Sequence, residues 1–246
     1  LNNAKWSRVH KQEMAFIAHF KNLNENDWLK YIKGKKVLST NCDTVVSLDL
    51  PHYCSHATPD CGGENGWCYT LSGRLSTAVR LQKAAFIDVY MERSPELFIE
   101  KVGNEIDLLV RNGLLPYPNL RYCGSGELTE SHLPIILKLS NKGIALWGFT
   151  KSINLAVKLN NAGVGVLFSC DKSTLRAKFA QAIKFNIPLA YTSSGVDDHP
   201  PANRTFVTFP IHKNGYVSEV VDTPSLCPKV LEEYLNGKRL PGSCQT

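Results

Sequence analysis

The amino-acid sequence predicts an α/β fold, a partial β/α barrel of about six parallel strands with an N-terminal helical extension. The chain has 246 residues, of which 43% are hydrophobic and 20% charged, so it is long enough to bury a core without covalent staples. From residue 119 onward, short apolar runs alternate with amphipathic segments of about ten to fifteen residues. This alternation is typical of a parallel sheet whose crossover helices lie outside it.

The N-terminal part, residues 1–40, is predicted to be the helical extension. Met14, Ile17, Ala18 and Phe20 fall on one face of a first helix, and a second helix is expected to stop at Gly34. The remaining residues, 41–246, would form the barrel with a cysteine loop and a C-terminal cysteine segment. Its first strand is expected within residues 44–50, after another short strand at 35–40.

Two consecutive helices are predicted next, at 74–92 and 94–113. The second has Ser94 as its N-cap, Pro95 at its first helical position and Gly113 at its end. The alternation that follows predicts strands at 119–127, 144–152, 164–174, 187–195 and 204–215, and helices at 130–143, 153–163 and 175–186, with Pro134 in the first turns of the first of these helices.

Charge and hydropathy exclude some classes of protein. The net charge is +6, but no dense block of Lys and Arg exists, which favours a solvated basic surface and supports no nucleic-acid partner. No apolar run approaches the roughly 20 residues of a membrane helix, and the N-terminus lacks the apolar centre of a secretory signal. We therefore expect a cytoplasmic protein without a membrane partner. The substrate and the oligomeric state cannot be read from the sequence.

Five cysteines are candidate metal ligands. Cys54, Cys61 and Cys68 are separated by six residues each in a glycine-rich stretch, which favours a metal site over the alternative, a disulfide framework. Cys227 and Cys244 lie near the end of the chain. We expect at least one of them to reach the barrel mouth as a fourth ligand or as part of a second metal site; the alternative is a disulfide between them.

Polar residues follow most predicted strands, at the end where β/α folds carry their chemistry. This placement would gather the cysteine loop and several charged side chains around one rim: Glu127, Lys151, Asp171, Asp197 and His212. Taken singly, each is better explained as a helix cap, a helix-start charge, an exposed turn or a solvated loop residue, and only their convergence on one rim favours a site. Gly124 and Gly126 would let the backbone approach a ligand closely.

The order of these motifs resembles the radical S-adenosylmethionine enzymes. The shared features are a three-cysteine loop after the first strand, a glycine-rich turn ending in Glu127 after the second, and the Ser169-x-Asp171 segment after the fourth. Cys68-Tyr69-Thr70, Ser125-Gly126-Glu127, Phe149-Thr150-Lys151-Ser152 and Cys227-Pro228 further resemble, in order, the motifs of the phage gene product eighty-eight domain family. The cysteine loop departs from the usual Cys-x3-Cys-x2-Cys spacing, and Glu127 stands where the second family has Asp.

The first resemblance implies a 4Fe–4S cluster on Cys54, Cys61 and Cys68, whose open iron holds the amino and carboxylate groups of S-adenosylmethionine. Gly124, Gly126, Glu127, Ser169 and Asp171 would then bind the cosubstrate, and Lys151 and Glu127 would serve as catalytic residues. Two alternatives use the same residues differently. One is a non-catalytic binding protein stabilised by zinc or a cluster. The other is a metal-independent β/α lyase or hydrolase with Glu127, Lys151 and Asp171 as acid–base groups.

Overall fold

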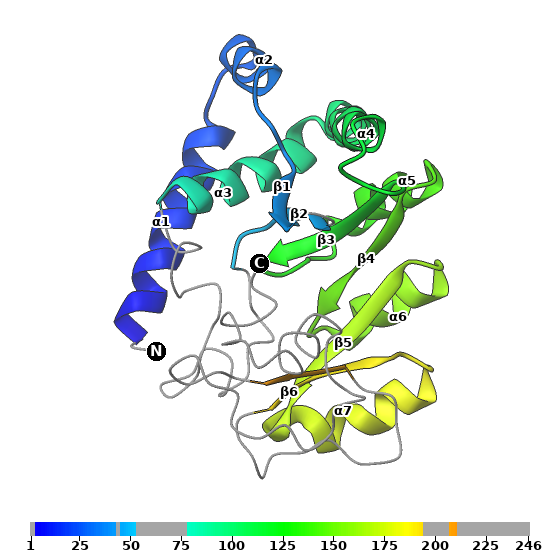
Figure 1. Cartoon of the computed structure of the whole chain (residues 1–246). Coiled ribbons are helices and arrows are strands. Elements are labelled where there is room, and N and C mark those ends of the chain that lie inside the picture. Colours follow the sequence, from blue (N-terminus) through cyan, green and yellow to red (C-terminus); the bar gives the residue numbers. More distant parts are fainter. Residues whose placement is uncertain (1–2, 43–44, 53–77, 194–206, 211–246) are drawn as a thin grey trace, which may run out of the picture.

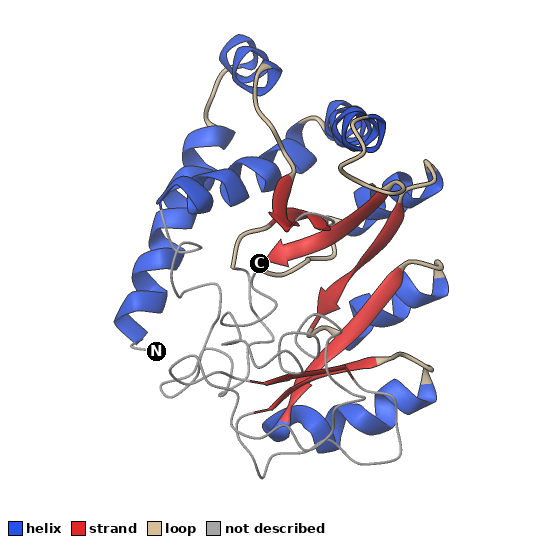
Figure 2. Cartoon of the chain, in the orientation of Figure 1, coloured by secondary structure: helices blue, strands red, loops and turns tan. Residues whose placement is uncertain are grey.

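In the computed structural model, described for residues 3–42, 45–52, 78–193 and 207–210, one mostly parallel sheet carries helices beside it (Figures 1 and 2). The helices are α1 (Asn3–Lys21), α2 (Glu25–Lys33), α3 (Ala78–Arg93), α4 (Pro95–Arg111), α5 (Leu133–Asn141), α6 (Ile153–Asn161) and α7 (Lys172–Lys184). The strands are β1 (Ser39–Cys42), β2 (Val45–Asp49), β3 (Asn119–Ser125), β4 (Ala145–Thr150), β5 (Gly165–Asp171), β6 (Leu189–Ser193) and β7 (Val207–Pro210).

The strands of the sheet follow one another in chain order, from β1 to β7. β1 is antiparallel to β2, and every later pair is parallel, so six strands from β2 onward form the predicted parallel sheet. Because crossovers between parallel strands are right-handed, this order places the crossover helices on one face. Figure 1 shows α4, α5, α6 and α7 along that side. Within the described residues, the edge strands β1 and β7 do not pair with each other, so the sheet is open and does not close into a barrel.

The expected elements are confirmed in type and order. Pro134 lies in the first turn of α5, as predicted. Ser94 precedes Pro95 at the start of α4, but its side chain makes no cap hydrogen bond. Its hydroxyl instead accepts a hydrogen bond from Trp28 Nε1 at 2.9 Å. Ser94 is therefore the N-cap residue, as predicted, but a tertiary contact occupies its hydroxyl.

The helical N-terminus packs into the same core as the sheet. Phe20 of α1, Trp28 of α2 and Phe86 of α3 are buried together, and the Phe86 ring contacts the rings of both others. Packing against α3 thus provides the apolar partner that α1 needs for stability in water. The extension is consequently part of the hydrophobic core that supports β2.

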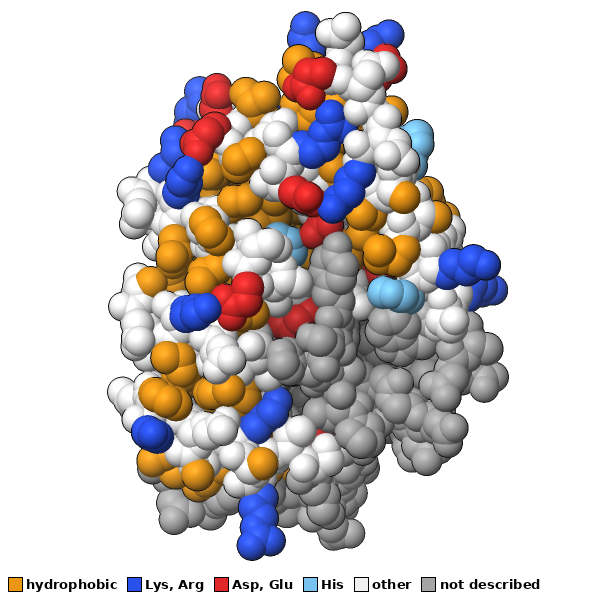
Figure 3. All heavy atoms as spheres, turned by 180° about the vertical axis from the view of Figure 1, so that it is seen from behind, with side chains coloured by type: hydrophobic (Ala, Val, Ile, Leu, Met, Phe, Trp, Pro, Cys, Tyr) orange, Lys and Arg blue, Asp and Glu red, His pale blue; other side chains and the backbone are white. Residues whose placement is uncertain are grey.

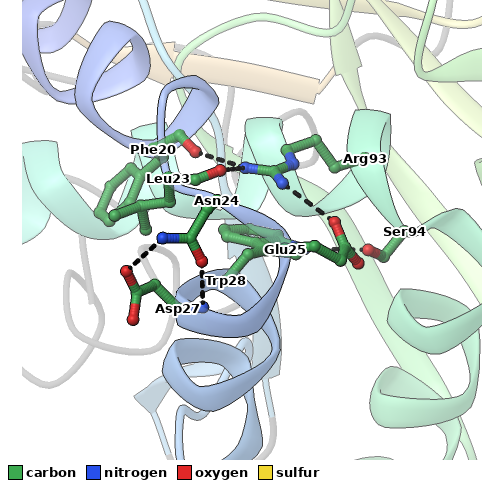
Figure 4. Close-up of polar contacts among 8 residues, drawn as sticks. All are labelled: Phe20, Leu23, Asn24, Glu25, Asp27, Trp28, Arg93 and Ser94. Carbon is green, nitrogen blue, oxygen red and sulfur yellow. Dashed lines mark hydrogen bonds and ion pairs between the residues drawn. The ribbon is translucent and has the colours of Figure 1, made fainter.

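Arg93 fixes the connection between α1 and α2 (Figure 4). Its guanidinium donates to the carbonyl oxygens of Phe20 and Leu23, both at 2.9 Å, and to Glu25 at 3.2 Å. It also lies 4.9 Å from the centre of the Trp28 ring. These bonds satisfy carbonyl groups that the end of α1 leaves without intrahelical partners.

Replacing Arg93 by Met should therefore destabilise the protein by about 2–3 kcal/mol, since charge-assisted hydrogen bonds are lost and a carbonyl stays buried without a partner. Urea unfolding of the two proteins measures the difference. Arg111→Met, at an exposed position in the last turn of α4, is the matched control and should stay within about 0.5 kcal/mol of the wild type. Equal losses in the two variants would contradict the role assigned to Arg93.

Candidate active site at the carboxyl edge of the sheet

The carboxyl ends of β2 and β3 are joined by backbone hydrogen bonds and an unusually close contact. Leu50 N donates to Ser125 O at 3.0 Å, and Glu127 N donates to Pro51 O at 3.2 Å. Gly126 lies between them with φ of 75°, and a Cβ atom there would be 2.0 Å from Leu50 O. A parallel pair can come this close only because the residue at the turn is glycine. We call this end of the strands the carboxyl edge.

The two glycines expected at a ligand thus have a structural explanation. A Cβ on Gly124 would lie 2.5 Å from Ser47 Oγ, and a Cβ on Gly126 would meet the backbone of Leu50 and Pro51. The structure shows a close approach at both glycines whose partner is β2, and the predicted approach to a ligand stays a prediction. The contacts with β2 account for both glycines without a cofactor.

Glu127 is the central polar group of the carboxyl edge. It follows β3, is 6% exposed, and interacts with the Thr150 hydroxyl and the backbone amide of Lys151 beyond β4. Burial raises the pKa of its carboxyl group, and those hydrogen bonds together with the Lys151 charge lower it in part. Its Oε1 atom is buried without a hydrogen-bond partner among the described residues. A buried acceptor of this kind is costly unless a ligand donates to it.

Lys151, Asp171 and Lys178 extend the site across β4 and β5. Lys178 Nζ, from α7, donates to Lys151 O at 2.9 Å and lies 4.8 Å from the centre of the Phe168 ring. Burial lowers the pKa of Lys178, as does the charge of Lys151, while Asp171 and Glu127 raise it. The structure therefore brings together Glu127, Lys151 and Asp171, as predicted.

Asp171 also has a structural role. It is the N-cap of α7, and its Oδ1 accepts hydrogen bonds from the Thr174 amide at 3.1 Å and from the Ser173 hydroxyl at 2.7 Å. The alternative interpretation of this residue as a helix cap is thus confirmed. Ser169, two residues earlier on β5, is half-buried.

Sequence reasoning missed a buried histidine–carboxylate pair at the end of β2. His52 Nδ1 lies 2.6 Å from Glu13 Oε1, and the His52 amide donates to Glu13 Oε2 at 3.0 Å. Both side chains are at most 5% exposed. Glu13 comes from α1, and 39 residues separate the pair in the chain, so no local pattern could reveal it. Lys178 was missed for the same reason.

The remaining predicted site residues, Cys54, Cys61, Cys68, Cys227 and Cys244, lie outside the described residues, as do Asp197 and His212. In the part of the chain that is described, no group of three or more His, Cys, Asp or Glu side chains could hold a metal. Cys123 and Cys170 are buried, and burial raises the pKa of Cys170 to about 12. The Cys170 thiol therefore lacks the thiolate character of a metal ligand or nucleophile.

The surface around these elements is mixed in charge. Figure 3 shows Lys and Arg side chains scattered among acidic and hydrophobic ones on the face it draws. Among the described residues, none of the helices is long and apolar enough to span a bilayer.

One prediction for this edge concerns Gly126. Gly126→Ala should cost about 3 kcal/mol or more, because its Cβ would overlap the Leu50 and Pro51 carbonyls and because its φ is positive. Gly143→Ala is the control, since Gly143 has φ of 82° but nothing within 4 Å of the added Cβ. That variant should cost about 1–2 kcal/mol, from backbone strain alone. Denaturant unfolding that gives equal costs would contradict the close contact with β2.

Another prediction concerns Glu127 and the pH dependence of stability. A raised folded pKa means that native Glu127 holds its proton more tightly than unfolded Glu127 does. Its contribution to stability is therefore present at low pH and is lost as the pH rises from the ordinary glutamate range through the folded pKa. Glu127→Gln should remove this loss, so the difference in unfolding free energy, variant minus wild type, should grow with pH.

Denaturant unfolding from pH 4 to pH 8 measures this difference. Glu100→Gln, at an exposed position on α4, should show no such trend. A difference that stays constant or falls with rising pH would contradict the dominance of burial at Glu127.

Comparison with known proteins identifies no relative: no protein-family model, curated protein or solved structure matches this chain. The resemblance to the radical S-adenosylmethionine enzymes and to the phage gene product eighty-eight domain family therefore remains a prediction from the motifs. The geometry of the carboxyl edge carries the functional argument.

Proposed function

We propose that this chain is an iron–sulfur enzyme of the radical S-adenosylmethionine type, built on a partial β/α barrel and acting at the carboxyl edge of its sheet. Three cysteines, Cys54, Cys61 and Cys68, would hold a 4Fe–4S cluster. The observation that carries the proposal is Glu127, whose Oε1 is buried at this edge with no partner among the described residues. An ammonium group, such as the amino group of S-adenosylmethionine, would supply the missing donor.

The chain order of the strands supports the same interpretation. Six parallel strands in sequence order bring the ends of β2, β3, β4 and β5 to one edge. The three-cysteine segment follows β2 in the chain, directly after the buried Glu13–His52 pair. A loop that starts at His52 thus begins beside Glu127, since the Glu127 amide bonds to Pro51.

The described residues have separable roles in this proposal. Glu127 would accept the amino group, with Thr150 and the Lys151 amide fixing its carboxylate. Lys151 would face the substrate, while Ser169 and Asp171 would hold the rest of the cosubstrate. When bound, the cluster and S-adenosylmethionine would supply the one-electron chemistry, and the chain would supply binding and exclusion of water. Cys227 or Cys244 would complete the cluster or a second metal site.

A second candidate is favoured by one observation. At the carboxyl edge burial raises the pKa of Glu127 and lowers that of Lys178, which moves an acid and a base toward neutral pH. A metal-independent β/α lyase or hydrolase would use such a pair directly. In that case the cysteines outside the described residues would have no catalytic role.

Metal content after anaerobic purification separates these functions. The proposal predicts iron and acid-labile sulfide with a broad visible absorption, lost when Cys54, Cys61 and Cys68 are replaced by Ser. The buried thiols give the control: Cys123→Ala and Cys170→Ala should keep the iron. Zinc in place of iron would indicate the binding protein stabilised by zinc, and the absence of any metal would favour the acid–base enzyme.

Calorimetric titration of S-adenosylmethionine into the iron-loaded protein tests the role of Glu127. Glu127→Gln should weaken binding about tenfold to a hundredfold, because a charge-assisted hydrogen bond is lost. Glu100→Gln should bind as the wild type does. Failure of the iron-loaded wild type to bind S-adenosylmethionine would remove the radical enzyme from consideration and leave an iron–sulfur binding protein.

A further inference from the structure

A half-buried arginine, Arg121, lies on the face of the sheet opposite the crossover helices. Phe168 of β5 points toward α7, because Lys178 of that helix lies over its ring. Side chains alternate along a strand, so Leu167 and Ser169 point to the other face. The register pairs Leu167 with Phe149, and Trp147 with Arg121. Arg121, Trp147, Phe149, Leu167 and Ser169 therefore share one face, which we call the inner face, and all five are half-buried.

Three contacts hold the Arg121 guanidinium in place. Its Nε donates to Cys123 O at 3.1 Å. Its central carbon lies 4.8 Å from the centre of the Phe149 ring and 5.6 Å from that of Trp147. The two rings also pack edge to face, with centres 6.0 Å apart. The guanidinium is consequently oriented before any ligand arrives, so little rotamer entropy remains to be lost on binding.

The outer edge of this guanidinium has unused donors. Arg121 has five N–H donors, and the bond to Cys123 uses the one on Nε. Its two terminal nitrogens make no hydrogen bond and no ion pair with any described residue. Arg93 is an instructive contrast: it also lies over an indole ring, yet its terminal nitrogens bond to Phe20, Leu23 and Glu25. Arg93 thus uses its terminal donors within the fold, whereas Arg121 does not.

We propose that Arg121 binds an oxyanion, a carboxylate or a phosphate, of the molecule on which the carboxyl edge acts. The two terminal nitrogens present parallel donors, the geometry that matches either group in a bidentate pair. Arg121 lies four residues before Ser125 on β3, so its Cα is about 13 Å from the carboxyl edge. A substrate of that length would place its anionic end on Arg121 and its reacting end beside Glu127 and Lys151. The net charge of +6 favours the approach of an anion.

This assignment of a substrate class rests on the proposed function, but anion binding can be measured without it. Inorganic phosphate and succinate are titrated separately by calorimetry into the full chain, purified anaerobically, at constant ionic strength and without S-adenosylmethionine. At least one should bind saturably, and the tighter of the two identifies the oxyanion. Anion binding by Arg121 does not require iron or turnover, so an iron-free preparation that binds the anion would support the Arg121 site even where the cluster proposal fails.

Arg121→Gln should weaken that binding about tenfold to a hundredfold. Arg176→Gln removes the same charge from an exposed position on α7 and should bind like the wild type. Arg121→Lys keeps the charge and the apolar stem but loses the two parallel terminal donors, so it should also bind more weakly. It replaces the Gln variant as the test if that variant does not fold. In the wild type the anion should change indole fluorescence, and Trp147→Phe should abolish that change.

Three results would overturn the proposal. The first is the absence of binding of either anion to the wild type. The second is wild-type affinity in both Arg121 variants. The third is an equal loss of affinity in Arg176→Gln, which would show that only the overall charge matters.

Discussion

The close contact between the ends of β2 and β3 determines the rest of this structure. Gly126 places the turn after β3 against the Leu50 and Pro51 carbonyls, with no space for a side chain between them. Two backbone hydrogen bonds close the contact, one to Ser125 O and one from Glu127 N. Glu127 is therefore buried beside the strand from which the cysteine segment departs. Any residue larger than glycine would separate the strands and expose the carboxylate to water.

Burial at this edge has a cost in stability that a binding site can explain. Glu127 ionises less readily than an exposed glutamate, and one of its oxygens has no partner among the described residues. Lys178, nearby, gives up its proton more readily than an exposed lysine. The buried Glu13 differs from Glu127, because both of its carboxylate oxygens have a partner in His52, at 2.6 Å and 3.0 Å. The incomplete group lies where β/α folds bind their ligands, which makes a ligand the simplest account of it.

Much of the fold could be predicted from the sequence because local patterns specify it. Apolar runs and Ser94–Pro95 located the strands and α4, and the six parallel strands are confirmed. What could not be predicted depends on contacts between distant segments. The N-cap position of Ser94 could be predicted, but the bond of its hydroxyl to Trp28, 66 residues away, could not. Gly126 was predicted to lie close to a ligand, and only the tertiary structure shows that it lies against β2.

The same limit applies to the site. Glu127, Lys151 and Asp171 could be predicted because each follows a strand, and strand ends meet at one edge. Glu13, Lys178 and Arg121 could not, because helix packing or strand register places them. The hydrogen-bond partners of a charged side chain distinguish a structural role from a functional one better than its residue type does. Arg93 satisfies helix-end carbonyls, whereas Arg121 is held by two rings and one carbonyl with its terminal donors unused. A cation fixed in this way, about four residues along β3 from the carboxyl edge, fits an anionic group on a molecule that reacts beside Glu127.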